Sequence, residues 1–437
     1  MKSYFRNFVF ALIAASAVYF SGAVSQGAIF NGECDPCEPA CEVLPCDPLC
    51  NPCTPCGRKS LFGQFEFYGY LQAGLYVNSR GAKTERLRTT NYRGRTVSFA
   101  VPDSGNSDLL GTTRLTEFQV NQLWLNLHKE ADGKHGLDWG ARAEVAFGTD
   151  LWLNQSFGDA GFDYGWQDGD YFTAIPQIYA QLAYGDLSVK LGKFEALVGY
   201  ESGRVEDCFF YSHSHLFMFE PCSYTGALFE YTPSDNFTAA AGYVTGADTS
   251  FNNHFDDHGF VGYLSYTFNP RLSASYAVSY SRYGNERFYR DGSLRWYGGN
   301  NGALHTVVLT YQLTKKLSYA IQCEYANAKD RQLKIDRQGY GFNNHLIYQI
   351  NDRWGVGLRA EWAKDADNDP NDFYGGYGFA GLYRGEVQEY TLGVKWTPYK
   401  NVSVHSELRY DRAQEEVFNF GRNKDQFSGG FCTVVGF

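Results

Sequence analysis

From residue 64 onward, hydrophobic and polar residues alternate along the chain in long runs. In the first run, QFEFYGYLQAGLYV (64–77), Phe65, Phe67, Leu71, Leu75 and Val77 share one face, and mostly polar residues share the other. Side chains of a β-strand point alternately to opposite faces, so this run predicts a strand with one apolar and one polar face. The same alternation recurs at 137–147, 354–362, 390–396 and 402–410.

Short segments rich in Gly, Pro, Asn, Asp and Lys separate these runs and predict tight hairpin turns. They lie at 130–136, 185–186, 232–236, 269–271, 314–316, 351–353 and 398–401. Longer polar or glycine-rich segments lie between them, at 78–116, 149–173, 200–222, 284–301 and 364–385. Short turns at one end and long loops at the other are typical of an outer-membrane barrel.

Alternation alone does not separate a membrane barrel from a soluble two-sheet sandwich, but two further features favour the barrel. The runs are about 10–14 residues long, which fits a tilted crossing of the bilayer. Trp and Tyr gather near the predicted strand ends, as in interfacial girdles. We therefore predict an all-β fold over 61–437, a transmembrane antiparallel up-and-down β-barrel of about 16 strands with lipid against its apolar faces.

The composition supports this class and adds constraints on partners. Aromatic residues make up 17 % of the chain, Gly numbers 47 and Met only 2, which differs from a helical soluble enzyme. The net charge of −10 argues against a nucleic-acid partner. The chain closes on a hydrophobic strand ending in Phe437, which resembles the recognition signal of barrel assembly. Outer-membrane lipid and the barrel assembly machinery are the expected partners.

The N-terminus has the layout of a secretory signal peptide, which we assign to 1–27: Lys2 and Arg6, an apolar run, then small residues. A Cys/Pro-rich extension follows at 28–60, expected to be disordered and periplasmic. It holds seven of the 11 cysteines: Cys34, Cys37, Cys41, Cys46, Cys50, Cys53 and Cys56. Internal disulfides, covalent links to other envelope proteins and a zinc site all stay open for them.

Several segments of the barrel region resemble a known family. They are NQLWLNLHKEADGKHGLDWGARAEVAFGTD (121–150), PQIYAQLAYGDLSVKLGKFEALVGYE (176–201), FFYSHSHLFMFEPCSYTGALFEY (209–231) and the closing strands. Together they are similar to the OmpL-like putative β-barrel porin-2 family over 65–437. The resemblance implies an outer-membrane diffusion channel with no catalytic residues and no established solute. Porins of this width commonly assemble as homotrimers.

Charged residues on the polar faces of the strands are the first candidate functional residues. Two interpretations stay open: walls of opposite charge that filter solutes, or ion pairs that fill the interior. The candidates are Arg142, Glu144, Lys190, Glu324, Arg359, Glu361, Glu407 and Arg409.

The segment 201–226 is the candidate for a constriction loop that folds into the lumen. It is long and combines Arg204, Glu206 and Asp207 with aromatic residues. A disulfide between Cys208 and Cys222 would stiffen it by about 3 kcal/mol. Pairing of these cysteines elsewhere, or two reduced thiols, are the alternatives.

Metal binding and catalysis have weak support. His213 with His215, His254 with His258, and the carboxylates of 365–369 are better explained as ordinary loop residues. Motifs for nucleophilic, zinc or phosphate chemistry are missing from the sequence, so we expect no enzyme, metal or cofactor. The predicted function is a porin for passive diffusion of small hydrophilic solutes. The alternative is a structural envelope protein whose barrel anchors a disulfide-linked surface layer.

Overall fold

The computed structural model describes residues 64–79, 87–92, 95–100, 116–156, 162–253, 257–288, 294–330, 335–365, 385–416, 418 and 422–437. Within these residues, no helix has the length and apolarity needed to cross a membrane. The predicted signal peptide, the seven N-terminal cysteines, His254 and the acidic loop after Asp365 lie outside the described part of the chain.

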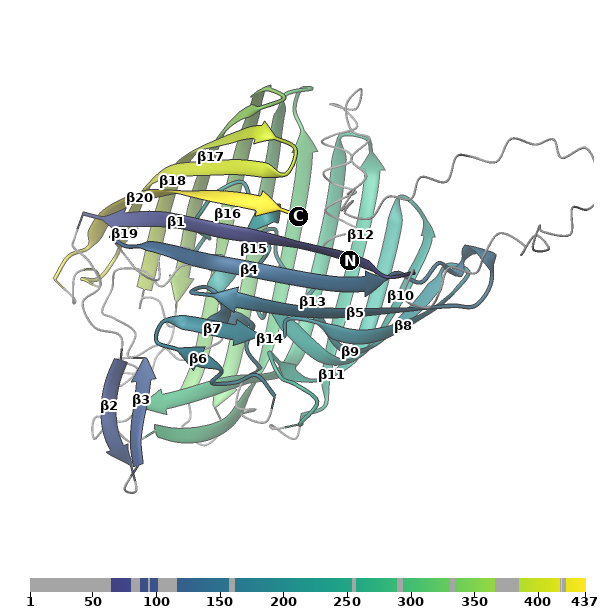
Figure 1. Cartoon of the computed structure of the whole chain (residues 1–437), viewed down its shortest axis with the longest axis horizontal. Helices are drawn as coiled ribbons and strands as arrows, with labels where there is room; N and C mark the ends of the chain where they lie inside the picture. Colours follow the sequence, from purple (N-terminus) through teal and green to yellow (C-terminus); the bar gives the residue numbers. More distant parts are fainter. Residues whose placement is uncertain are drawn as a thin grey trace, which may run out of the picture.

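Sixteen antiparallel strands form the wall of a closed barrel in the described residues, and pairing of the first strand with the last closes it. Figure 1 shows β1, β4 and β5 on the near wall and β13 and β14 behind them. The predicted fold class is confirmed. The wall strands are β1 (Glu66–Asn78), β4 (Phe118–Lys129), β5 (Asp138–Gly148), β8 (Ile178–Tyr184), β9 (Leu187–Glu195), β10 (Ser223–Ser234), β11 (Phe237–Ala247), β12 (Gly259–Asn269), β13 (Leu272–Phe288), β14 (Leu294–Gln312), β15 (Leu317–Asp330), β16 (Ile335–Asn351), β17 (Trp354–Asp365), β18 (Gly385–Tyr399), β19 (Val402–Ala413) and β20 (Asp425–Gly436).

The remaining elements lie in the connections between wall strands. Strands β2 (Leu87–Tyr92) and β3 (Arg95–Ala100) form a separate hairpin between β1 and β4. The β5–β8 connection contains the 3-10 turn η3 (Leu151–Asn154) and the short strands β6 (Gln167–Asp168) and β7 (Tyr171–Ala174). Three more 3-10 turns are η2 (Gly133–His135), η4 (Val205–Asp207) and η5 (Leu216–Phe219).

All seven predicted tight turns fall between consecutive wall strands, so the hairpin prediction is confirmed. The expected loop at 284–301 is wrong: β13 continues to Phe288, β14 begins at Leu294, and Asn285 pairs with Tyr297. A strand that extends beyond the bilayer needs no apolar face, so polar composition does not end it.

The two faces of β1 have the predicted orientation. Tyr70, Gln72 and Tyr76 point into the barrel and are fully buried, whereas Phe67 is 58 % and Val77 47 % exposed on the outer surface. Aromatic rings gather on this outer surface near the short turns, where Trp354 and Trp396 stack with ring centroids 5.5 Å apart. An apolar belt with aromatic ends is the surface that a lipid bilayer covers.

The last residue takes part in closing the barrel. The backbone N–H of Phe437 donates to the carbonyl of Gly69, and that of Gly69 donates to the carbonyl of Phe437, both at 2.9 Å. A Cβ at Gly69 would stand 2.8 Å from the Phe437 ring and 2.5 Å from the carbonyl oxygen of Trp124. Glycine therefore makes room for the terminal ring at the seam between β1 and β20.

Candidate functional site

The connection from β9 to β10, residues 196–222, lies inside the barrel, and we call it the inward segment. Its residues bond to inward-facing side chains on β4, β5, β15, β17 and β19, on both sides of the lumen. It carries the three predicted constriction residues, Arg204, Glu206 and Asp207. The fold thus brings the predicted loop and most of the predicted wall charges into one cluster.

Two wall carboxylates hold the backbone of the inward segment. Glu407 of β19 accepts the N–H of Tyr211 at 2.8 Å and the N–H of Ser212 at 3.2 Å. Glu361 of β17 accepts the N–H groups of His215 and Leu216, each at 2.7 Å. Each carboxylate therefore binds two consecutive N–H groups, and charge-assisted bonds of this kind are about twice as strong as neutral ones.

Two wall arginines hold neighbouring carbonyl groups. Nη1 of Arg359 donates to the carbonyl of Ser212, and Nη1 of Arg409 to the carbonyl of His213, each at 2.6 Å. Arg359 and Arg409 are both almost completely buried. We call Arg359, Glu361, Glu407 and Arg409 the clamp, because together they bind main-chain donors and acceptors over six residues.

Further carboxylates balance the clamp arginines, and sequence analysis did not single them out. Arg359 lies 3.1 Å from Glu389 and 2.7 Å from Glu201, a residue of the inward segment. Arg409 lies 2.8 Å from Asp411, whose carboxylate also lies 3.0 Å from Nε2 of His215. Burial disfavours the ionised Glu201 side chain, but the attraction of Arg359 outweighs this and lowers its pKa to about 2.

The inward segment is anchored on the opposite wall by Arg204. Its guanidinium forms an ion pair with Glu144 of β5 and lies 4.7 Å from the ring centroid of Trp124. Glu144 also accepts from Asn126 at 2.8 Å and lies 3.4 Å from Arg142. One buried carboxylate thus joins two arginines, one from the wall and one from the inward segment.

Inward-facing glycines provide the space for two phenylalanine rings. A Cβ at Gly357 of β17 would stand 2.5 Å from the Phe209 ring, and one at Gly393 of β18 would stand 2.7 Å from the Phe210 ring. Real Cβ atoms do not approach so closely, so larger residues at these wall positions would displace the rings. The alternating pattern places these glycines on the inner face, although their function is not visible from sequence alone.

The other side of the inward segment packs by apolar contact. Val198, Leu216 and Phe219 belong to one buried cluster whose wall residues run from Leu228 on β10 to Ala413 on β19, and Leu216 lies against Gly341 of β16. Dispersion and removal of apolar surface from water hold this side, with no directional bond required.

The remaining predicted charges also have partners. Lys190 of β9 pairs with Glu230 of β10 at 3.1 Å. Glu324 accepts from Thr306 at 3.2 Å and from Gln322 at 3.0 Å. Glu206 lies 3.8 Å from Arg204. The N–H of Asp207 donates to the carbonyl of Arg204 within η4. Arg359 and Glu361 are not paired with each other: each binds the inward segment.

The expected Cys208–Cys222 disulfide is not formed in the structure, which contains both residues as thiols. Sγ of Cys208 lies 3.2 Å from the carbonyl of Ser202 and 3.7 Å from Nε2 of His213. The N–H of Cys222 instead donates to Asp248 beside β11. Nζ of Lys395 on β18 donates to the carbonyl of Cys208 at 3.1 Å, so different walls hold the two cysteines.

Neither loop histidine takes part in a metal cluster, since the described residues contain no group of three or more His, Cys, Asp or Glu placed to hold an ion. His213 bonds to the carbonyl of Ser202 at 2.7 Å, and His215 faces Asp411 and Arg409. Both histidines therefore serve within the hydrogen-bond network of the clamp.

Comparison with known families supplies the assignment that the geometry suggests. The family model described as "Putative beta-barrel porin-2, OmpL-like" matches residues 93–437. The chain belongs to this porin family. It is an outer-membrane porin, and the predictions of family and of pore-forming function are confirmed. A search of curated proteins found no match.

Solved structures similar to this porin share its fold. The outer-membrane channel DcaP of Acinetobacter baumannii has a TM-score of 0.52 at 12% identity, covering 85% of this chain and 97% of its own. An anion-selective porin from Comamonas acidovorans has a TM-score of 0.52 at 12% identity, covering 85% of this chain and 99% of its own. OmpT of Vibrio cholerae has a TM-score of 0.50 at 10% identity, covering 85% and 97%. At such low identity the likeness concerns the fold alone.

Proposed function

We propose that this porin conducts small hydrophilic solutes and ions passively, and that the inward segment sets the width and charge of the path. One observation carries the proposal: the clamp on one wall and Arg204 on the other hold the inward segment across the lumen. A fixed segment with charged side chains inside a barrel acts as a filter by size and charge.

The clamp charges contribute to selectivity indirectly in this proposal. Because Arg359 and Arg409 are buried against carboxylates and main-chain carbonyls, they are not offered to a passing ion. Glu206, with 30 % of its side chain exposed, and the partly buried Arg142 are the better candidates for direct contact with solutes. The charge filter expected from the wall residues is therefore assigned mainly to these two.

We extend the proposal to export and assembly. Residues 1–27 would direct secretion and be removed, leaving the cysteine-rich extension of 28–60 in the periplasm, the side to which barrels of this class turn their short loops. Phe437 would serve the assembly machinery before it closes the seam with Gly69. A homotrimer is the proposed assembly, by analogy with OmpT of Vibrio cholerae, for which a trimer form is described.

Single-channel current through the purified protein in a planar bilayer tests the proposal. Discrete conductance steps are expected, and a salt gradient gives the charge preference from the sign of the reversal potential. Glu206→Gln should shift that potential toward anions, whereas Glu117→Gln, an exposed residue at the start of β4, should not. If folded, heat-modifiable barrels give no conductance steps, the channel proposal is contradicted and an anchoring role in a cross-linked envelope layer is favoured.

A further inference from the structure

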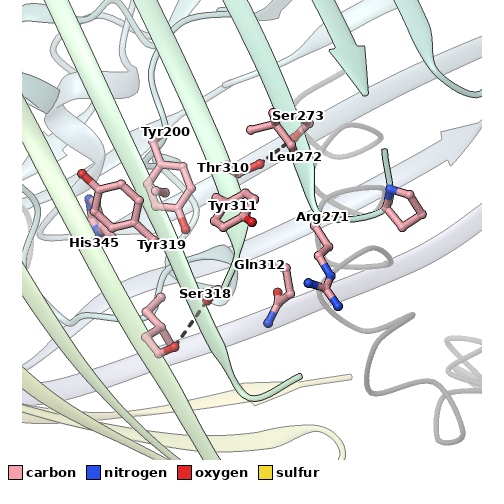
Figure 2. Close-up of a pocket in the computed structure, with 13 residues that line it drawn as sticks. Tyr200, Arg271, Leu272, Ser273, Thr310, Tyr311, Gln312, Ser318, Tyr319 and His345 are labelled. Atoms are coloured by element: carbon pink, nitrogen blue, oxygen red, sulfur yellow. Dashed lines mark hydrogen bonds between the residues drawn. The ribbon is translucent and has the colours of Figure 1, made fainter. Parts of the chain in front are cut away.

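The short turns form one rim of the barrel, and half of this rim is basic. The four turns from β12 to β19 hold five basic residues and one acidic residue, Asp352. We call the five the basic arc: Arg271, Lys315, Lys316, Arg353 and Lys400. All five are exposed, and Figure 2 shows the Arg271 side chain at the turn between β12 and β13.

The other three short turns carry the opposite charge. The turns at 130–136, 185–186 and 232–236 hold four acidic residues, one histidine and one lysine, Lys134. The acidic residues are Glu130, Asp132, Asp186 and Asp235, and all are exposed. Lipid surrounds a barrel on every side, so contact with headgroups alone does not account for two arcs of opposite sign.

Main-chain bonds join the turns of the basic arc in one row. The carbonyl of Lys316 accepts from the N–H of Gln349 on β16 at 2.7 Å, and that of Arg353 from Thr397 on β18 at 2.8 Å. Neighbouring strands lie about 4.8 Å apart, which places successive turns about 10 Å apart. This spacing is close to the screening length in 0.1 M salt, about 10 Å, so the positive potentials of the turns add.

The barrel itself does not neutralise the basic arc. Within the described ranges of the chain, none of the five side chains forms an ion pair. Nζ of Lys316 donates to a neutral group, the carbonyl of Ile350, at 2.7 Å. An acidic chain lying along the turns would therefore relieve the mutual repulsion of these cations.

The N-terminal extension of this chain contains such an acidic segment, residues 33–47. It holds five carboxylates and no Lys, Arg or His, and the first basic residues after it are Arg58 and Lys59. The carboxylates belong to Glu33, Asp35, Glu38, Glu42 and Asp47. Five negative side chains thus stand against the five positive side chains of the basic arc.

The extension joins the barrel at the end of the basic arc. Strand β1 begins at Glu66, and its neighbour β20 is bound to the β18–β19 turn, where the carbonyl of Asn401 accepts from the N–H of Gly436 at 2.8 Å. Residues 48–64 can span at most about 60 Å. The four turns of the arc extend over about 30 Å. The acidic segment can therefore reach every turn of the arc.

We propose that the acidic segment 33–47 docks on the basic arc of its own barrel, along the short turns from β12 to β19. The inference goes beyond the proposed channel and does not require an open pore. Docking would hold the N-terminal cysteines beside one half of the barrel mouth. A partner linked to the porin through these cysteines would then stand on the side of the basic arc.

The test applies a water-soluble carbodiimide, which joins a carboxyl group to a lysine amine as an amide, to the purified full-length porin in phosphatidylcholine nanodiscs. Mass spectrometry of the monomer band, which excludes links between copies, measures where segment 33–47 is attached. Links to Lys315, Lys316 and Lys400 should exceed those to Lys134 at least about fivefold, because the positive potential concentrates the acidic segment. Lys134 is the internal control, since it is an exposed lysine on a short turn of the acidic half.

Two changes of the electrostatics sharpen the test. In 1 M salt the screening length falls to about 3 Å, so the preference for the basic arc should disappear. Arg271→Gln/Arg353→Gln weakens the arc but keeps every reporting lysine, and it should lower the yield at least about threefold. Arg422→Gln/Lys424→Gln is the matched control, because it removes two exposed positive charges from the long connection between β19 and β20.

The outcomes separate docking from the channel itself. Absent links, equal yields at Lys134 and the arc lysines, or a yield unchanged in Arg271→Gln/Arg353→Gln would overturn docking and leave the channel proposal standing. Links that vanish when the nanodiscs contain phosphatidylglycerol would assign the arc to lipid phosphates and would also overturn it. A porin that gives the expected links but no conductance steps would support docking and contradict the channel.

Discussion

The inward segment meets the barrel wall in two chemically different ways. Along β17 and β19, the clamp binds individual main-chain atoms with directional bonds of 2.6–2.8 Å for its closest contacts. Along β16, next to β17, Leu216 and Phe219 pack against the wall at Gly341 and Gly339. The polar side determines where each backbone group lies, whereas the apolar side contributes adhesion that tolerates small shifts. Position and adhesion are thus supplied by different kinds of contact on adjoining parts of the wall.

Removal of a clamp arginine is expected to have the largest effect on stability and conductance. Arg359→Ala leaves Glu201 and Glu389 buried without their partner and frees the Ser212 carbonyl. We expect the free energy of unfolding to fall by about 3–5 kcal/mol. Single-channel conductance should rise and become noisier as the segment loosens.

Unfolding by urea in detergent measures the loss of stability in Arg359→Ala, and single-channel recording in a bilayer measures the change in conductance. Arg353→Ala, at the exposed turn before β17, is the control and should change neither. A stable Arg359→Ala barrel with wild-type conductance would show that the clamp does not position the inward segment.

Truncation of an apolar side chain should lower the free energy of unfolding by less than loss of Arg359 and should leave the position of the inward segment unchanged. Leu216→Ala creates a cavity in the buried cluster and should lower stability by about 2–4 kcal/mol, whereas Leu216→Met should cost less than about 1.5 kcal/mol. Both variants should keep the wild-type reversal potential. A shifted potential in Leu216→Met would mean that the apolar side also sets the position of the segment.

Adding a methyl group beneath the phenylalanine rings should have a moderate effect. Gly357→Ala places a Cβ within 2.5 Å of Phe209, so we expect a loss of about 1–3 kcal/mol and altered conductance. A second change, Phe209→Leu, should restore part of the lost stability and part of the wild-type conductance. Gly436→Ala is the control, since its nearest neighbour would be 3.8 Å away. If the double variant regains neither stability nor conductance, direct steric contact between residue 357 and the Phe209 ring is contradicted.

The smallest expected effect is a pH response through Glu201. Its pKa in the folded protein is about 2, below the ordinary value of 4.5, so its ionised form adds stability above about pH 4.5. That contribution is lost as the pH falls toward 2. Thermal midpoints of wild type and Glu201→Gln should therefore differ most at neutral pH and converge on acidification. A constant difference between the two proteins across this range would exclude Glu201 as the titrating group.

Local patterns sufficed to predict the barrel, but not the partners inside it. Turn chemistry at 185–186 or 351–353 and the alternation of β1 are readable within a few residues. The inward position of Glu407 was readable in the same way. Its partners Tyr211 and Ser212 are almost two hundred positions away in the chain, and no periodicity reports such a contact.

A weaker signal for the site was nevertheless present in the sequence. Gly357 and Gly393 occupy inward positions on adjacent strands, where a barrel filled only with water would not require the smallest residue. Glycines at the same height as wall charges indicate that something packs closely there. The cysteine prediction failed for a related reason: spacing along the chain allowed a loop disulfide, but Lys395 of β18 binds the carbonyl of Cys208 and Asp248 beside β11 binds the N–H of Cys222.

The clamp binds the main chain of residues 211–216, and every residue except proline offers the same N–H and carbonyl groups. The side chains of this stretch are bound as well: the hydroxyl of Tyr211 donates to Asn121, and His215 faces Asp411. Glu206 lies outside the stretch and is partly exposed, so mutation there can vary the charge that faces solutes while the clamp keeps the backbone in place. For a nanopore engineer, residue 206 is an exchangeable sensing position on a fixed backbone.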